Sequence, residues 1–282
     1  MLKRDEWLPG VPCWVDTGQP DPAAAAEFYG GLFGWEYDER YAPGEDVPYR
    51  VAMLHGLEVA AIGAKAEQAP PTPMWNTYVR VVSADRTADA VRDAGGNVLL
   101  EPFTVGRAGR MGVFADPAGA MFSVWEPEAT RGAQLVNDPG TWNFSGLLTS
   151  GVEGAKRFYA DVFGWDARPF DPEAGSFFWR RPGYVDYLEK INPGTREQFA
   201  AVGAPEGFED AVAWVAPADD GVAPHWSVVF AVDDADAIAA RAKELGGRVL
   251  EPPSDAPWVR TTTLADPAGA VFTANKFVPP QG

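Results

Sequence analysis

Cysteine, histidine and long apolar runs are all scarce in this sequence. Its 282 residues include one cysteine, Cys13, which excludes an intrachain disulfide and favours a cytoplasmic location. There are two histidines, His55 and His225, although histidine is the commonest ligand of catalytic transition metals. No apolar run approaches the roughly 20 residues that a membrane span needs, and residues 1–6 lack the apolar stretch of a signal peptide. No membrane contact is expected.

Basic residues are outnumbered by acidic ones. The 23 Lys and Arg residues, against 40 Asp and Glu, give a formal net charge of −17. Such a field repels phosphate backbones, so nucleic-acid binding is not expected. It weakly favours a cationic ligand, but an acidic, solubilising surface is the simpler explanation. The sequence also has no nucleotide-binding loop, no serine-centred nucleophile elbow and no Cys-x-x-Cys pair.

An internal repeat organises the chain. The segment FYGGLFGW at 28–35 returns as FYADVFGW at 158–165, and the flanking residues 9–35 and 139–165 align without a gap. A repeat of this length indicates that the fold is built twice. Each candidate site residue can therefore be compared with its counterpart in the other half.

Each half is predicted to contain two units of one strand, one helix and three strands. The first helix opens at Asp21-Pro22 and stops at Gly34, and the second stops at Gly95-Gly96. Short strands are expected around the helices, including 11–18, 75–82, 97–103, 142–148, 177–180, 184–188 and 225–232. The prediction is an α+β protein with a first domain at 1–127, a linker at 128–139 and a second domain at 140–282. Residues 192–224 carry extra length, as either a lid or a longer surface loop.

Tandem pairs of these units resemble the vicinal oxygen chelate superfamily, also called glyoxalase/bleomycin resistance/dioxygenase. The resemblance rests on Phe-Tyr-(x)3-Phe-Gly-Trp after the first helix of each half, Gly-Gly after the second, and Asp-Pro-Ala-Gly-Ala before each last strand. It covers nearly the whole chain and is most similar to a two-repeat, actinobacterial, Cfp30B-like branch. It implies curved sheets that form cups. It implies little about function, because the superfamily includes enzymes, antibiotic-binding proteins and proteins of antibiotic gene clusters.

Metal-using members of this superfamily carry His, His or Gln, and Glu on the concave face of the sheet. The positions in this chain that match those ligands are Trp14, Asn76 and Ser123 in the first half and Phe144, Ser227 and Thr273 in the second. Asn, Ser and Thr are poor ligands for a divalent transition metal, and Trp and Phe cannot bind one. No metal and no cofactor is therefore expected. His225 shares a strand face with Ser227, but a satisfied or exposed histidine explains it better, and His55 is most simply a turn residue.

Aromatic side chains take the place of the metal ligands. Residues two apart on a strand share a face, which adds further candidates to each cup. The first cup is predicted to hold Trp14, Asp16, Asn76, Tyr78, Ser123 and Trp125. The second is predicted to hold Trp142, Phe144, His225, Ser227, Thr273 and Asn275. Rigid aromatic faces with a few polar groups suit a flat, apolar ligand; the alternative is that the aromatics simply fill the cups.

Other notable residues are better explained by architecture. Trp35, Trp165, Trp75 and Trp226 occupy matching positions in the two halves, which is typical of a role in packing. Cys13 neighbours Trp14, so strand alternation points it away from the cup, and no histidine stands near it in sequence to activate it. A small buried residue is the expected role of Cys13. No residue is assigned a catalytic role.

The leading hypothesis is a metal-free protein that binds an aromatic or polycyclic small molecule, such as an antibiotic or a biosynthetic intermediate. Its role would be sequestration, self-resistance or support of a partner biosynthetic enzyme. The first alternative is an enzyme of the same fold, such as a lyase, dioxygenase or hydroxylase. The second is a protein that acts through protein contacts. With four units in one chain, a monomer or a weak homodimer is expected.

Overall fold

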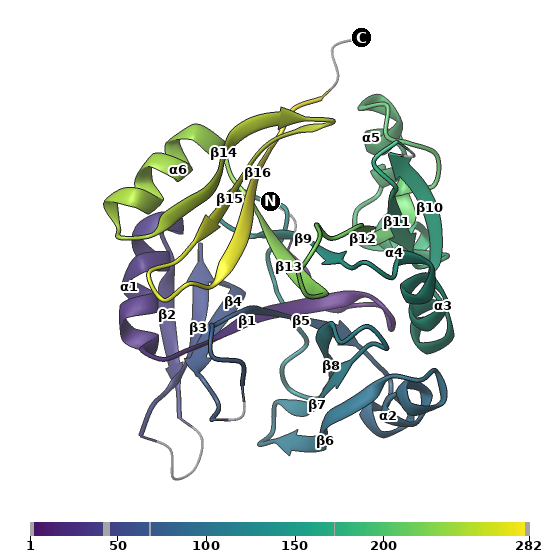
Figure 1. Ribbon diagram of the computed structural model, residues 1–282, viewed down its shortest axis with the longest axis horizontal. Coiled ribbons are helices and arrows are strands. Elements are labelled where there is room, and N and C mark those ends of the chain that lie inside the picture. Colours follow the sequence, from purple (N-terminus) through teal and green to yellow (C-terminus); the bar gives the residue numbers. More distant parts are fainter. Residues whose placement is uncertain (1–2, 42–45, 68, 172, 280–282) are drawn as a thin grey trace.

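The computed structural model describes residues 3–41, 46–67, 69–171 and 173–279. Two eight-stranded sheets form its framework, one from each half of the chain (Figure 1). The strand order is β2-β3-β4-β1-β5-β8-β7-β6 in the first sheet and β10-β11-β12-β9-β13-β16-β15-β14 in the second. The repeat units therefore pair within each half, and each half builds one curved sheet. None of the helices in these ranges is both long and apolar enough to cross a bilayer.

The first half runs in the order that the repeat predicts. Its elements are β1 Pro12–Gln19, α1 Pro22–Phe33, β2 Glu36–Arg40, β3 Tyr49–Leu54, β4 Leu57–Ala64, β5 Trp75–Arg80, α2 Ala84–Asp93, β6 Asn97–Val105, β7 Gly109–Ala115 and β8 Met121–Pro127. Asp21 caps α1 by accepting hydrogen bonds from the backbone nitrogens of Ala23 and Ala24. Gly34 ends that helix at φ 75°, a left-handed conformation that glycine adopts without steric cost.

The second half repeats this order with one addition. Its elements are β9 Trp142–Leu148, α3 Val152–Phe163, β10 Asp166–Asp171, β11 Ser176–Arg180, α4 Tyr184–Ile191, α5 Thr195–Ala201, the 3-10 turn η1 Phe208–Asp210, β12 Ala211–Ala216, β13 His225–Ala231, α6 Ala235–Glu244, β14 Arg248–Ala256, β15 Val259–Ala265 and β16 Val271–Phe277. In the first half, β3 and β4 are joined directly through His55-Gly56, whereas α4, α5 and η1 separate β11 from β12.

The prediction of a strand at 184–188 was wrong, because these residues lie in the helix α4. Helix and strand patterns cannot be separated over five residues, and the apolar Tyr184, Val185 and Leu188 also fit one helix face. The bounds predicted for the extra length, 192–224, were also only partly correct. The added segment begins at α4, and the strand β12 lies inside the predicted range.

The backs of the two sheets pack against each other through aromatic side chains. The rings of Trp75 on β5 and Phe230 on β13 are 5.0 Å apart, and the hydroxyl oxygens of Thr77 and Ser145 are 2.9 Å apart. Trp35 donates from Nε1 to the carbonyl of Gly140 at 2.7 Å, and Trp165 reaches Gly10 in the same way at 2.6 Å. The repeated tryptophans therefore join the two halves.

The two repeated motifs also hydrogen-bond to each other across the halves. The Tyr29 hydroxyl donates to Oδ2 of Asp266 at 3.0 Å and accepts from Nε1 of Trp75 at 3.0 Å. In the mirror arrangement, Tyr159 donates to Asp116 at 3.4 Å and accepts from Trp226 at 2.8 Å. The tyrosine of each first helix is thus bound to the Asp-Pro-Ala-Gly turn of the other half.

Replacing Tyr29 with phenylalanine is expected to destabilise the protein by about 1–3 kcal/mol, because it leaves the buried Trp75 indole without its acceptor. Urea denaturation would measure the change. Tyr41→Phe is the matched control, because this hydroxyl is exposed and should contribute little. Equal, small changes in both variants would show that the buried tie between the halves does not stabilise the fold.

Candidate functional site

The concave face of the first sheet, here called the first cup, is lined by Trp14, Asp16, Tyr49, Asn76, Tyr78, Ser123 and Trp125. Strand pairing places Trp14 opposite Tyr78, Asp16 opposite Asn76, and Tyr78 opposite Ser123. The structure therefore brings together all six residues that the sequence predicted for this cup. Five of them are buried, and Asn76 is partly exposed.

Asp16 is the centre of a hydrogen-bond network in the first cup. Its Oδ2 accepts from the hydroxyls of Tyr49 and Tyr78, both at 2.9 Å, and its Oδ1 accepts from Nδ2 of Asn76 at 2.8 Å. Trp14 donates from Nε1 to the Tyr49 hydroxyl at 3.0 Å. All the donors are neutral. Burial raises the pKa of Asp16, and the three hydrogen bonds only partly oppose that rise.

Replacing Asp16 with asparagine tests this environment. Because burial raises the pKa of Asp16 in the folded protein, its carboxyl stabilises the fold most at low pH and loses that contribution as pH rises through the folded pKa. The difference in unfolding free energy between wild type and Asp16→Asn is therefore expected to fall as pH is raised above about 4. Urea denaturation across a pH series measures it, and a difference that grows with pH would contradict burial as the dominant cause.

The concave face of the second sheet, here called the second cup, is lined by Phe144, Phe178, Phe208, Trp214, Ser227, Thr273 and Asn275. Gly146 stands at the position that matches Asp16. Trp214 pairs with Gly146, whereas Ala61 pairs with Asp16. The first cup therefore has a carboxylate, Asp16, next to the small Ala61, whereas the second cup has Gly146 next to the large indole of Trp214. The second cup contains no counterpart of the Asp16 network.

The second cup is more accessible than the first. Phe144, Thr273 and Asn275 are all partly exposed, whereas their counterparts Trp14, Ser123 and Trp125 are buried. The Ser227 hydroxyl oxygen is buried without a hydrogen-bond partner in the described chain. Partly exposed aromatic rings around an unpaired hydroxyl form a concave surface with one polar group to orient a ligand.

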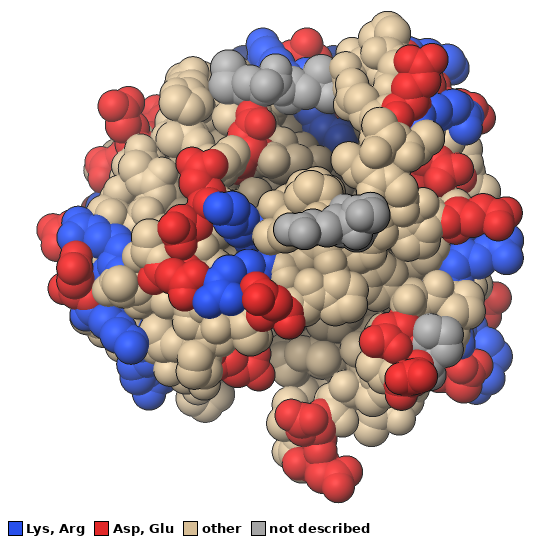
Figure 2. Space-filling model, turned by 90° about the horizontal axis from the view of Figure 1, so that it is seen from above, with Lys and Arg blue, Asp and Glu red and all other residues tan. Residues whose placement is uncertain are grey.

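The added segment of the second half lies along this cup. The Phe208 ring of η1 packs against Phe144 at 6.4 Å and against Phe178 at 5.3 Å between ring centroids. A Cβ atom on Gly203, just after α5, would lie 3.9 Å from Trp258 at the tip of the β14–β15 hairpin. Figure 2, which looks down on the molecule from above, shows a surface that is hollowed near the top of the view.

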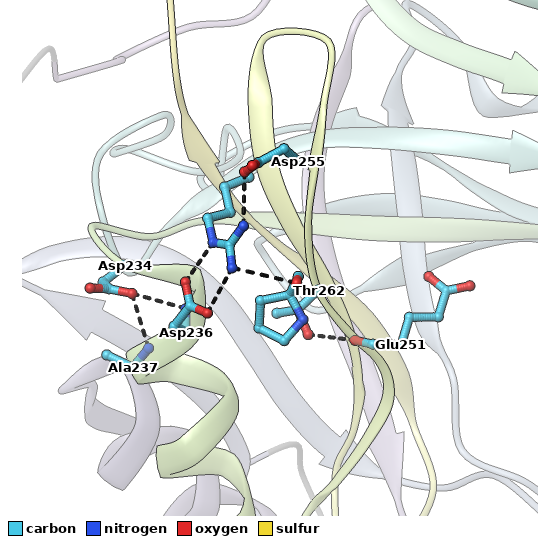
Figure 3. Close-up of polar contacts among 8 residues, drawn as sticks. Asp234, Asp236, Ala237, Glu251, Asp255 and Thr262 are labelled. Carbon is cyan, nitrogen blue, oxygen red and sulfur yellow. Dashed lines mark hydrogen bonds and ion pairs between the residues drawn. The ribbon is translucent and has the colours of Figure 1, made fainter.

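An ion-pair cluster braces the hairpin that forms one wall of the second cup. Figure 3 shows Asp236 and Asp255 around one guanidinium, that of Arg260. Arg260 binds Asp236 through Nε and Nη2 at 2.5 and 2.8 Å, and Asp255 through Nη1 at 2.8 Å. Arg110 and Asp85 form the matching bidentate pair in the first half, without a second aspartate. Because these charged groups are exposed, solvent screens the pairs, and they contribute little to the stability of the fold.

Trp142 does not line the second cup as predicted. The strand register shifts between Trp142 and Phe144, so that Trp142 pairs with Phe230, a residue that packs between the halves. The Trp142 ring lies 5.9 Å from Trp7, and its Nε1 donates to Oγ of Ser145 at 3.2 Å. A β-bulge therefore reverses the side on which strand alternation places this residue.

His225 was also predicted for the second cup, and the strand register places it on the same face as Ser227, while Cys13 is the small buried residue that was expected. His225 begins β13 and uses Nδ1 to contact the carbonyl of Ala223 at 2.8 Å. Cys13 is fully buried, and burial raises the pKa of its thiol well above the ordinary value, which makes the thiol a weak nucleophile.

Four lining residues were missed in the sequence. Tyr49 and Phe178 match no part of the repeated motifs, and Phe208 belongs to the added segment, which has no counterpart in the first half. Trp214 lies on β12, where it matches Ala61 of β4, but the added residues before β12 hide that match in the sequence.

Neither cup has a donor set that fits a divalent transition metal. Among the described residues, no group of three or more His, Cys, Asp or Glu side chains lies close enough together to hold an ion. In the first cup, the one carboxylate, Asp16, is already bound by three neutral donors. The second cup offers hydroxyl and amide oxygens, and one of these, Oδ1 of Asn275, accepts from Thr261 at 2.6 Å. These residues do not fit the metal that other members of this fold use.

Sequence relatives extend over the whole chain. CFP32 of Mycobacterium tuberculosis (strain CDC 1551 / Oshkosh) is 39% identical over 284 residues, covering 100% of both chains. The anthracycline biosynthesis protein DnrV of Streptomyces peucetius is 36% identical, covering 95% of this chain and 93% of its own length.

Solved structures support the same fold. The Mn(II)-bound glyoxalase from Novosphingobium aromaticivorans superposes with a TM-score of 0.61 at 18% identity, covering 98% of this chain and 83% of that one. The 2,3-dioxygenase LapB from Pseudomonas sp. KL28 gives 0.60 at 11% identity, covering 98% and 96%. Residues 15–124 match the Glyoxalase/Bleomycin resistance protein/Dioxygenase superfamily, and residues 147–275 match the Glyoxalase-like domain. This chain therefore belongs to the glyoxalase/bleomycin resistance/dioxygenase superfamily, with two of its domains in tandem.

Proposed function

We propose that this protein binds an aromatic or polycyclic small molecule in the second cup without using a metal. One observation carries the proposal: the partly exposed rings of Phe144 and Trp214 belong to β9 and β12, the next two strands in the sheet from Ser227, whose hydroxyl has no partner in the described chain. Stacking against such rings contributes about 0.5–1.5 kcal/mol per pair beyond the burial of area. A ligand carbonyl or hydroxyl would complete the hydrogen bonding of Ser227.

The biological role that fits this site is sequestration, self-resistance or support of a biosynthetic enzyme. The name of the relative DnrV places that protein in anthracycline biosynthesis, and anthracyclines are flat and polycyclic. By extension, the ligand of this chain would be an antibiotic of that shape or an intermediate on the way to one. We place the protein in the cytoplasm as a monomer or a weak homodimer.

The first cup supports a second candidate function, an enzyme that transfers protons. Asp16 has a raised pKa and contacts two tyrosine hydroxyls, a set of groups that could accept and return a proton. Trp14, Tyr78 and Trp125 are buried, so the first cup offers a ligand less aromatic surface than the second cup does.

Intrinsic tryptophan fluorescence, titrated with a panel of aromatic natural products that includes anthracyclines, tests the proposal. Saturable quenching at micromolar ligand is the expected result, because Trp214 and Trp258 lie on the second cup and its rim. Quenching that is lost in Asp16→Asn but kept in Phe144→Ala would favour the first cup and the enzyme. No saturable quenching from any compound would overturn ligand binding.

A further inference from the structure

Arg4 is a buried cation without an anionic partner. Its side chain is 7% exposed, and its guanidinium carbon lies 4.5 Å from the centre of the Trp7 ring. Nη1 donates to the hydroxyl of Tyr184 on α4 at 2.6 Å, but Nε is buried with no acceptor. In the described ranges, no carboxylate forms an ion pair with Arg4. Buried charges are ordinarily paired, because desolvation of a lone ion is expensive.

A pocket of about 480 Å³ opens beside Arg4. It is lined by Arg4, Asp5, Glu6, Glu58, residues 129–132 and Gln134. Each carboxylate on its wall already has its own cation. Asp5 pairs with Lys3 at 3.2 Å, Glu58 pairs with Arg40 at 2.6 Å, and Glu6 pairs with Arg131. Arg4 is therefore the cation of this pocket whose charge remains uncompensated.

A second arginine also lacks a partner. Arg80, at the end of β5, has a buried Nη1 without an acceptor, and its side chain forms no hydrogen bond or ion pair in the described chain. Burial raises the pKa of Tyr187 of α4, and the charges of both arginines lower it. The Tyr187 hydroxyl donates to the carbonyl of Glu6 at 2.6 Å, which ties α4 to the segment that carries Arg4.

We propose that the pocket at Arg4 is an oxyanion site, which takes the carboxylate or phosphate group of a small molecule, and that the unpaired Arg80 adds positive charge to it. Arginine suits this role because its planar fork of donors matches the oxygens of either group. An oxyanion would pair the orphan Nε of Arg4. The pocket shares no lining residue with either cup, but it adjoins the first cup, because the carbonyl of Thr130 on its wall accepts from Nε1 of Trp125 at 2.7 Å.

The position of the site links it to the added segment of the second half. Tyr184 and Tyr187 belong to α4, and the rings of these two tyrosines are stacked 6.3 Å apart. Arg4 and Glu6 reach α4 from the N-terminal segment, and Arg80 belongs to the first sheet. An anion bound at Arg4 would therefore contact one half of the protein while bracing a helix of the other.

Thermal unfolding of the full chain in sodium phosphate or sodium acetate, against sodium chloride at equal ionic strength, tests the proposal. A saturable rise in Tm is expected, because a ligand that binds the folded state stabilises it. A rise with phosphate alone identifies a phosphate site, and a rise with acetate identifies a carboxylate site. No saturable rise with either anion would overturn the proposal.

Two variants locate the anion. Arg80→Gln and Arg4→Gln are each expected to lower, at least tenfold, the affinity for the anion that raises Tm. The exposed Arg86→Gln should leave that affinity unchanged. Without anion, Arg80→Gln should be as stable as wild type or more stable, because it removes an uncompensated charge. If Arg80→Gln and Arg4→Lys both bound the anion as tightly as wild type, the proposal would be overturned. It would also be overturned if Arg80→Gln were less stable than wild type by the same amount with and without phosphate.

Discussion

Replacing Gly146 with alanine is expected to destabilise the protein by about 3 kcal/mol, at the upper end of the range for overpacked cores. A Cβ atom at this position would lie 2.0 Å from Cε2 and 2.4 Å from Nε1 of Trp214. The indole would have to leave its place against β9, and the neighbouring phenylalanines would have to follow. Urea denaturation measures the loss.

The control for Gly146 is another glycine of the same half. Gly154 lies inside α3, and a Cβ there would meet no atom within 4 Å. Gly154→Ala is therefore expected to be neutral or to stabilise the helix by about 0.5–1 kcal/mol. If the two glycine variants behaved alike, the indole of Trp214 would not fill the floor of the second cup.

A double variant tests whether the small size of Gly146 compensates for the large indole of Trp214 in the second cup. Gly146→Ala with Trp214→Ala restores space beside β9, as Ala61 does beside Asp16 in the first half. The combined destabilisation should be smaller than the sum of the two single changes by about 1–3 kcal/mol, the coupling expected for side chains in contact. Additive effects would contradict this contact.

Replacing Phe144 with alanine is expected to weaken binding of an aromatic ligand at least tenfold, or about 1.4 kcal/mol. Phe144 keeps part of its ring exposed in the second cup and contacts Phe208 on the added segment. Trp14→Ala should weaken binding less, because the ring of Trp14, the counterpart of Phe144, is buried in the first cup. Isothermal titration of each variant with the strongest quencher from the fluorescence panel measures the change.

Two further variants sharpen this result. Ser227→Ala should reduce affinity without loss of stability, because its hydroxyl has no partner in the described chain to lose. Phe277→Ala removes a ring that is 54% exposed at the end of β16 and should have no effect on affinity. A ligand that binds Phe144→Ala as tightly as wild type would move the site out of the second cup.

The repeat made the fold predictable. Two copies of the Phe-Tyr and Asp-Pro-Ala-Gly motifs set the unit and its multiplicity, and strand alternation then placed Trp14, Asp16 and Tyr78 on one face. Their contact in the structure shows that period-two reasoning holds along regular strands. Within the second cup, the same reasoning placed Phe144 and Ser227 correctly.

The same reasoning failed where the backbone departs from regularity. Trp142 lies one bulge away from Phe144, and a bulge leaves no clear mark in a single sequence. Phe208 lies in the added segment, whose tertiary packing against the cup local propensity does not specify. Trp214 follows that segment on β12, so the added residues break the sequence alignment that would have matched it to Ala61.

Titration of chelator-dialysed protein with the strongest quencher from the fluorescence panel tests metal-free binding in the second cup. We expect one ligand bound per chain, with an affinity that neither chelator nor added Mn²⁺ or Fe²⁺ changes. Binding that is lost after dialysis and restored by one equivalent of metal would contradict this expectation. The metal would then be held by residues other than those at the six positions that match the ligands of the superfamily, from Trp14 to Thr273.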